Sequence, residues 1–178
     1  LREKGHAVSL FDTNFKESSF QIKPYLRQNP DYLVVYDDGF NYLTKMCLTN
    51  MREAAYEMIG FAKAQGIKVF VSSSDSTDHF EEYLQKGADA VLLGEADETL
   101  LELIERGENW NNCKGIAFLE NGAFVKTPPR ANLKDLSDLP LPAWDLVDIK
   151  QYKEAWSVHG YFSINLATTR GCPFKCNW

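Results

Sequence analysis

The sequence lacks three features that would settle its class at once: a long apolar run, a basic surface and a framework of spaced cysteines. No stretch reaches the roughly 18 to 20 apolar residues of a membrane-spanning helix. Residues 1–5 carry charge where a secretion signal would be apolar. Lysine and arginine number 19 against 25 acidic residues, a net charge of -6 without a basic stripe. These absences predict a cytoplasmic protein with no membrane span and no nucleic-acid partner.

The composition is that of an ordinary globular chain. Its 178 residues are 44% hydrophobic and 25% charged, which is enough to bury one core and part of a second. Cys47 and Cys113 stand alone, whereas Cys172 and Cys176 lie four residues apart. In a chain without a secretion signal, a close cysteine pair indicates metal binding or redox chemistry before it indicates a disulfide.

Short apolar runs alternate with amphipathic segments through the first hundred residues. Glycine and polar residues end each run, as at Gly66 after the longest amphipathic segment. We expect strands at residues 6–11, 32–36, 68–71 and 90–93, and helices at 48–65, 79–86 and 99–106. Continuously apolar strands alternating with helices predict an α/β fold, a parallel sheet with helices on both faces. Ligands are then expected at the carboxyl ends of the strands.

The pattern changes after Gly107. Two apolar runs, 115–119 and 123–127, flank an Asn-Gly pair, which predicts a β-hairpin. Residues 127–142 contain four prolines and suit an extended linker. A further strand is expected at 161–167.

The chain then runs through residues 168–178, TTRGCPFKCNW. A strand entering a glycine turn with two thiols on a short loop resembles the opening of the radical S-adenosylmethionine (SAM) enzymes, whose motif is C-x3-C-x2-C. Cys172 and Cys176 match its first two cysteines, and the preceding LPLPAWDL resembles the segment before the family's barrel. The resemblance implies that these two residues are metal ligands, holding a [4Fe–4S] cluster that binds SAM.

An earlier segment, GEADETL at residues 94–100, resembles the end of the cobalamin-binding domain that precedes the barrel in one group of these enzymes. The resemblance implies a flavodoxin-like (Rossmann-like) sheet of order 2-1-3-4-5 with cobalamin over its carboxyl ends. Ser72-Ser73 stands where related cobalamin domains have Gly-Gly, so serine hydroxyls would replace bare backbone there. The candidate cofactor-binding residues are Asp12, Thr13, Asp37, Ser72, Ser73, Ser74, Gly94 and Glu95.

The resemblance divides the chain into four parts. Residues 1–107 form the flavodoxin-type domain, whose first strand would precede residue 1, and 108–130 form a hairpin extension. Residues 131–160 form a linker, and 161–178 start a truncated radical SAM barrel. The implied partners are cobalamin, the protein's own barrel and a small-molecule substrate held mostly by barrel loops. The full-length protein is expected to be an enzyme and this stretch alone to be inactive.

Two other interpretations remain open. A receiver domain of the same architecture would accept phosphate at Asp37 and use Ser72 or Ser73 as its switching hydroxyl. Its lysine-proline pair is replaced here by Gly94-Glu95, and a carboxylate would repel the phosphoryl group. The domain could instead keep the fold without a cofactor and serve as an accessory module of the barrel.

Overall fold

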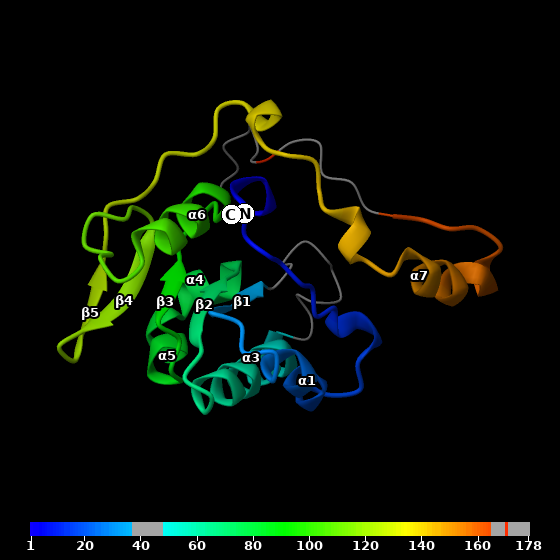
Figure 1. The fold of residues 1–178 in the computed structure, drawn as a ribbon, viewed down its shortest axis with the longest axis horizontal. Coiled ribbons are helices and arrows are strands. Elements are labelled where there is room, and N and C mark those ends of the chain that lie inside the picture. Colours follow the sequence, from blue (N-terminus) through cyan, green and yellow to red (C-terminus); the bar gives the residue numbers. More distant parts are fainter. Residues whose placement is uncertain (37–47, 165–169, 171–178) are drawn as a thin grey trace, which may run out of the picture. The chain divides into compact units, whose positions relative to one another are not determined.

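The computed structural model describes residues 1–36, 48–164 and 170. The chain divides into two compact units, Leu1–Ala7 with Phe11–Asn132, and Val8–Leu10 with Leu133–Trp178. The first unit contains a five-stranded sheet (Figure 1). Among the described residues, no helix has both the length and the apolar composition needed to cross a bilayer.

Three strands of the sheet are parallel and follow the chain in spatial order. They are β1 (Tyr32–Tyr36), β2 (Lys68–Ser72) and β3 (Ala90–Leu92). Apolar residues dominate all three, and each contains at least one valine, as expected for strands covered on both faces. The order β1-β2-β3 is the order that 2-1-3-4-5 assigns to its last three strands. The expected α/β class is therefore confirmed.

Helices cover both faces of this sheet. Alternate residues of β2 face opposite ways: Val69 and Val71 pack in the core beneath α3 (Leu48–Lys63) and α5 (Phe80–Gln85). Phe70 packs on the other face, with Leu103 of α6 (Asp97–Arg106). Figure 1 shows α3 and α5 on one side of the strands and α6 on the other. Short helices complete this unit at Arg2–Lys4, Thr13–Phe15, Ser19–Ile22, Lys23–Leu26 (α1) and Ser74–Asp78 (α4).

The predicted hairpin is present and joins the same sheet. β4 (Ile116–Glu120) and β5 (Ala123–Lys126) are antiparallel, and β4 pairs with β3 in the antiparallel sense. Asn121 and Gly122 both have positive φ, 51° and 81°, the conformation of a type I′ turn. The two-residue turn therefore forms for the reason its sequence indicates.

Two expected strands need correction. Residues 6–11 form no strand, although a 3-10 helix does end at Gly5 just before them. A strand needs a hydrogen-bonded neighbour, and none of the described strands pairs with residues 6–11. At the other end, residues 161–164 are not in a strand, and 165–167 lie outside the described residues.

The second unit contains a helix in the segment interpreted as a linker. α7 (Ile149–Trp156) is capped by Asp148, whose Oδ1 accepts a hydrogen bond from the Gln151 N–H at 3.2 Å. Ile149, Tyr152 and Trp156 follow at helical spacing, a signal that the proline-rich stretch before it obscured. Further 3-10 turns lie at Leu136–Asp138, Trp144–Leu146 and Ser157–His159.

Candidate functional site

The carboxyl ends of the three parallel strands meet at one edge of the sheet. Tyr36 at the end of β1 pairs with Ser72, and Ser72 pairs with Leu92 near the end of β3. Candidate residues follow each of the three strands: Asp37 after β1, residues 72–74 at the end of β2, and residues 94–95 after β3. The pairing of β2 with β3 makes the last two segments neighbours. We call residues 36, 72–74 and 94–95 the carboxyl edge. Ligands of open parallel sheets bind at such an edge.

The three serines after β2 have different environments. Ser72 is buried, with 4% of its surface exposed. Ser73 caps α4, because its Oγ accepts the Ser76 N–H at 2.8 Å while its backbone is extended. Ser74 is exposed. The Ser73 hydroxyl therefore serves the helix, and the Ser74 hydroxyl is the one that faces solvent.

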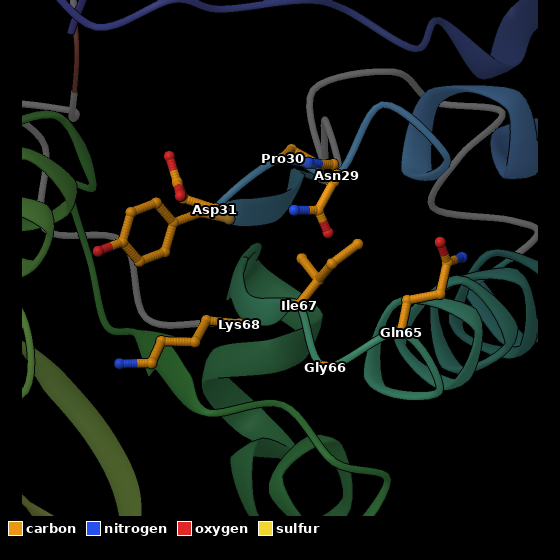
Figure 2. A pocket seen from close by; sticks show the side chains of 8 residues that line it. Asn29, Pro30, Asp31, Gln65, Gly66, Ile67 and Lys68 are labelled. Atoms are coloured by element: carbon orange, nitrogen blue, oxygen red, sulfur yellow. The ribbon is translucent and has the colours of Figure 1, made fainter.

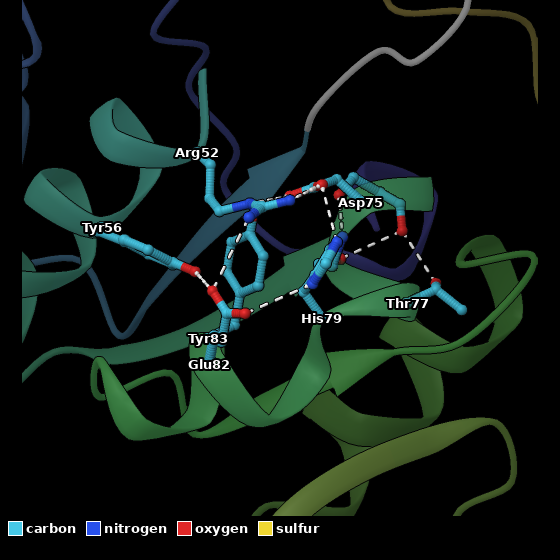
Figure 3. Close-up of polar contacts among 9 residues, drawn as sticks. Arg52, Tyr56, Asp75, Thr77, His79, Glu82 and Tyr83 are labelled. Atoms are coloured by element: carbon cyan, nitrogen blue, oxygen red, sulfur yellow. Dashed lines mark hydrogen bonds and ion pairs between the residues drawn. The ribbon is translucent and has the colours of Figure 1, made fainter. Parts of the chain in front are cut away.

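A polar cluster around the buried Asp75 lies directly beyond these serines (Figure 3). Arg52 of α3 donates two hydrogen bonds to the Asp75 carboxylate, from Nε at 2.8 Å and from Nη2 at 2.5 Å. The Tyr83 hydroxyl donates to the same carboxylate at 2.8 Å, and His79 Nε2 lies 3.9 Å from it. The Asp75 side chain is only 4% exposed. One buried carboxylate thus joins three helices behind the end of β2.

The pKa values of this cluster show which protons are fixed at neutral pH. Hydrogen bonds from Arg52 hold the pKa of Asp75 below its ordinary value of 3.8, despite burial. Burial, and then donation to Asp75, raises the pKa of Tyr83 far above its ordinary range. Burial, and then the hydrogen bond to Glu82 at 3.0 Å, raises the pKa of Tyr56 to about 12. Asp75 is therefore charged and both tyrosines are neutral, which suits a structural tie rather than proton transfer.

Asp75 is not among the candidate residues that the sequence indicates. The structure adds a bidentate arginine 23 residues away and a tyrosine on the next helix. No local spacing joins Arg52 to Asp75, so only the packing of α3 against α4 and α5 reveals the pair.

The turn after β3 is open backbone. Gly94 is exposed and has φ of 77°, the left-handed region that favours glycine. A Cβ placed on it would meet no heavy atom within 4 Å. A ligand can therefore approach the main chain here without meeting a side chain of residue 94. Glu95 follows and is half-buried.

Asp12 and Thr13 do not follow a described strand that would bring them to the carboxyl edge. Asp12 caps the 3-10 helix Thr13–Phe15, with its Oδ1 accepting the Asn14 N–H at 3.0 Å, and no strand leads into it. Thr13 begins that helix. Asp37, Cys172 and Cys176 lie outside the described residues.

A pocket of about 300 Å³ lies at the amino ends of β1 and β2 (Figure 2). Because these strands are parallel, this position is the edge of the sheet opposite the carboxyl edge. None of the candidate residues lines the pocket, and Lys68 at its rim pairs with Glu108 at 2.9 Å. The lining consists of Asn29, Pro30, Asp31, Tyr32, Gln65, Gly66, Ile67 and Lys68.

Within the described ranges, no three His, Cys, Asp or Glu side chains gather as metal ligands. Cys113 is a buried free thiol, and burial raises its pKa, which disfavours the reactive thiolate. A cluster-binding hypothesis therefore depends on Cys172 and Cys176.

Comparison with known proteins identifies relatives of this chain. An uncharacterized methyltransferase of Pyrococcus horikoshii is 33% identical over 91 residues, covering 49% of this chain and 19% of that protein. The anaerobic magnesium-protoporphyrin IX monomethyl ester cyclase of Synechocystis is 34% identical over 107 residues, covering 57% and 21%. The chain is similar to part of known enzymes.

A second methyltransferase named as uncharacterized, also from Synechocystis, is 31% identical over 130 residues, covering 71% of this chain and 20% of that protein. No family model matches the chain. The chain spans about a fifth of the length of these curated relatives. At this coarse level the comparisons support an enzyme family of the methyltransferase and cyclase kind.

Proposed function

We propose that this chain is the amino-terminal part of a cobalamin-type radical SAM enzyme of the methyltransferase or cyclase kind. Its sheet domain binds cobalamin at the carboxyl edge, and residues 161–178 begin the catalytic barrel. The exposed Gly94 turn beside the serines of β2 carries the proposal, because it leaves main chain open at the edge where such sheets bind ligands. The relatives' printed names support the enzyme class.

The described residues fit a nucleotide-bearing cofactor at one turn better than at the other. At Gly94 the main chain is accessible and no side chain fills the space above it. At β2 one lone pair of the Ser73 hydroxyl accepts the Ser76 N–H to cap α4, whereas the Ser74 side chain is exposed. Contacts with the cofactor are therefore assigned to the Gly94 and Glu95 backbone and to the Ser74 hydroxyl.

Cys172 and Cys176 are assigned to a [4Fe–4S] cluster with SAM. Two thiolates four residues apart in the sequence are suitable donors for iron, and a complete site of this class needs a third. Cys172 and Cys176 would hold such a cluster, and in its reduced state it would supply the one electron that splits SAM into methionine and a 5′-deoxyadenosyl radical. A small-molecule substrate and the protein's own barrel are the partners that follow from this assignment.

An equilibrium titration of the full-length protein with hydroxocobalamin tests the cofactor site. Ser74→Trp places bulk at the exposed position of the carboxyl edge without removing the Ser73 cap, so we expect at least tenfold weaker binding. Asp78→Trp places the same bulk at the far end of α4 and should leave affinity unchanged. Equal affinity in both variants would mean that cobalamin does not bind at Ser74, and no binding by the full-length protein would shift the assignment to a cofactor-free accessory module.

Anaerobic reconstitution of the full-length protein tests the cluster. Iron and sulfide per chain should fall sharply in Cys172→Ala and Cys176→Ala, because a cluster that has lost a thiolate ligand is labile. Cys113→Ala removes a buried thiol of the sheet domain and serves as the matched control. Unchanged iron content in Cys172→Ala would remove the radical SAM assignment.

A further inference from the structure

We infer that Arg130 and Thr99 are positioning residues that hold the Gly94–Glu95 turn in its ligand-ready shape. The inference rests on the proposed function, since it concerns the turn assigned to cofactor contact. Neither residue reaches the carboxyl edge itself. They act through a chain of hydrogen bonds that starts on the segment after the hairpin.

The hydrogen-bond chain runs from a charged side chain to the backbone of the turn. Arg130 Nε donates to Thr99 Oγ1 at 2.8 Å, and Thr99 Oγ1 donates to the Glu95 carbonyl at 3.3 Å. Thr99 is completely buried. A single hydroxyl both accepts and donates, so it transmits the position of Arg130 to the main chain of Glu95.

Ion pairs on α6 keep the arginine in place. Arg130 pairs with Glu102, and its Nη1 lies 3.5 Å from Glu98 Oε2. Burial favours a higher pKa for Glu102, yet hydrogen bonds from Arg130 and Arg106 outweigh it and lower that pKa. The Arg130 side chain is 19% exposed, so most of it is packed against its neighbours.

Gly115 permits this arrangement. It has φ of 74°, and a Cβ there would lie 3.3 Å from both the Arg130 Cβ and the Leu93 carbonyl oxygen, and 3.4 Å from Thr99 Oγ1. The Gly115 N–H donates to the Pro128 carbonyl at 2.9 Å, and its own carbonyl accepts the Leu93 N–H at 2.7 Å. Gly115 thus links Leu93, just before the Gly94 turn, to Pro128, two residues before Arg130.

The need for such a tie follows from the chemistry of the turn. A glycine with open space around it has more accessible backbone conformations than any other residue, and binding must restrict them. A hydrogen bond to the Glu95 carbonyl restricts them before the ligand arrives. Preorganisation of this kind raises affinity without contact with the ligand.

Four variants of the full-length protein separate positioning from general stability. Thr99→Val removes both hydrogen bonds at nearly constant volume, and Thr99→Ser restores the hydroxyl. Arg130→Lys keeps the positive charge but loses the planar fork that reaches Thr99 and the glutamates together. Arg106→Gln is the matched control, because it removes the 2.7 Å ion pair to Glu102 without touching Thr99.

Two measurements are made on each variant: hydrogen–deuterium exchange of the 93–98 segment and equilibrium binding of hydroxocobalamin. Thr99→Val should exchange about fivefold faster in this segment, the value of one hydrogen bond, and bind about fivefold more weakly. Thr99→Ser should return the exchange rate and the affinity to the values of the unsubstituted protein. Arg130→Lys should give values between those of the unsubstituted protein and those of Thr99→Val. Arg106→Gln should leave both unchanged.

The outcomes for the two proposals are distinguishable. If the unvaried protein binds no hydroxocobalamin, the cofactor assignment is lost, and exchange in the 93–98 segment still decides whether Arg130 and Thr99 hold the turn. If Thr99→Val leaves that exchange unchanged, or Thr99→Ser fails to restore it, the positioning role is wrong even when cobalamin binds. An equal change in Arg106→Gln would also overturn it.

Discussion

The ends of β2 and β3 lie side by side yet are built in opposite ways. After β2, Ser73 caps the next helix with its own side chain, and the buried Asp75 is tied to Arg52 and Tyr83. After β3, Gly94 carries no side chain, and the turn is held from outside through Arg130. One strand end is fixed by the residues that follow it, whereas the other depends on a residue more than thirty positions away.

The difference indicates that the two turns have different roles at a binding edge. A capped and buried turn is rigid but offers few free polar groups. An open glycine turn offers accessible backbone, and it needs distant contacts to limit its motion. Substitutions at either strand end can test whether the two turns are held in these different ways.

The largest effect is expected at the buried carboxylate. Asp75→Ala leaves the Arg52 guanidinium and the Tyr83 hydroxyl without their acceptor, which should lower the free energy of unfolding by about 3 kcal/mol. Urea unfolding followed by circular dichroism measures it. Asp78→Ala, an exposed aspartate of the same helix, should change stability by less than about 0.5 kcal/mol. Similar losses in both would mean that the cluster does not secure the β2 end.

A smaller loss is expected at the glycine behind the β3 turn. Gly115→Ala adds backbone strain and a methyl group 3.3 Å from two neighbours, which should cost about 2 kcal/mol. Gly122→Ala shares the positive φ but meets nothing within 4 Å, so it should cost about 1 kcal/mol. The difference between the two, from thermal or urea unfolding, reports the close packing alone, and equal costs would contradict it.

The cap of α4 is worth less. Ser73→Ala removes the acceptor of the Ser76 N–H and should cost about 1 kcal/mol. Ser74→Ala changes an exposed side chain and should be nearly neutral in the same unfolding assay. A neutral Ser73→Ala would show that its hydroxyl is available for a ligand after all.

The smallest effect is the acid dependence of Asp75. Its folded pKa lies below the unfolded value of 3.8, so the unfolded chain takes up the proton first as the pH falls. The stabilisation is therefore complete at pH 7 and is lost progressively toward and below pH 4. The stability difference between the unvaried protein and Asp75→Asn should narrow by about 0.3 kcal/mol from pH 7 to pH 4. A difference that widens in acid would reverse the assigned sign.

Features that depend on residues close together in the sequence could be predicted, and features that depend on distant residues could not. The three buried strands and the Asn121-Gly122 hairpin depend on local composition and turn chemistry, and both are found as expected. A strand at residues 6–11 was wrong, because its pairing depends on a neighbour and not on its own apolar residues. The Arg52–Asp75 and Arg130–Glu102 contacts join residues 23 and 28 positions apart, so no local pattern indicates them.

The same limit applies to the candidate site. Ser72 to Ser74 and Gly94 were placed at the carboxyl edge by following the strands, and the register brings their strand ends together. Ser73 acts as a cap because α4 begins directly after it. The sequence of residues 72–78 alone does not determine where that helix begins. The assignment of Cys172 and Cys176 remains a prediction from their spacing.

The hairpin has a consequence for self-association. β3 would expose a row of amide and carbonyl groups along its outer side, and such a row templates pairing with another chain. β4 occupies that side, and the sheet ends instead at β5, which is four residues long. Lys126 on β5 lies over the Phe80 ring at 3.9 Å, which places a positive charge on the last strand. A short, charged border strand of this kind discourages aggregation from that side of the sheet.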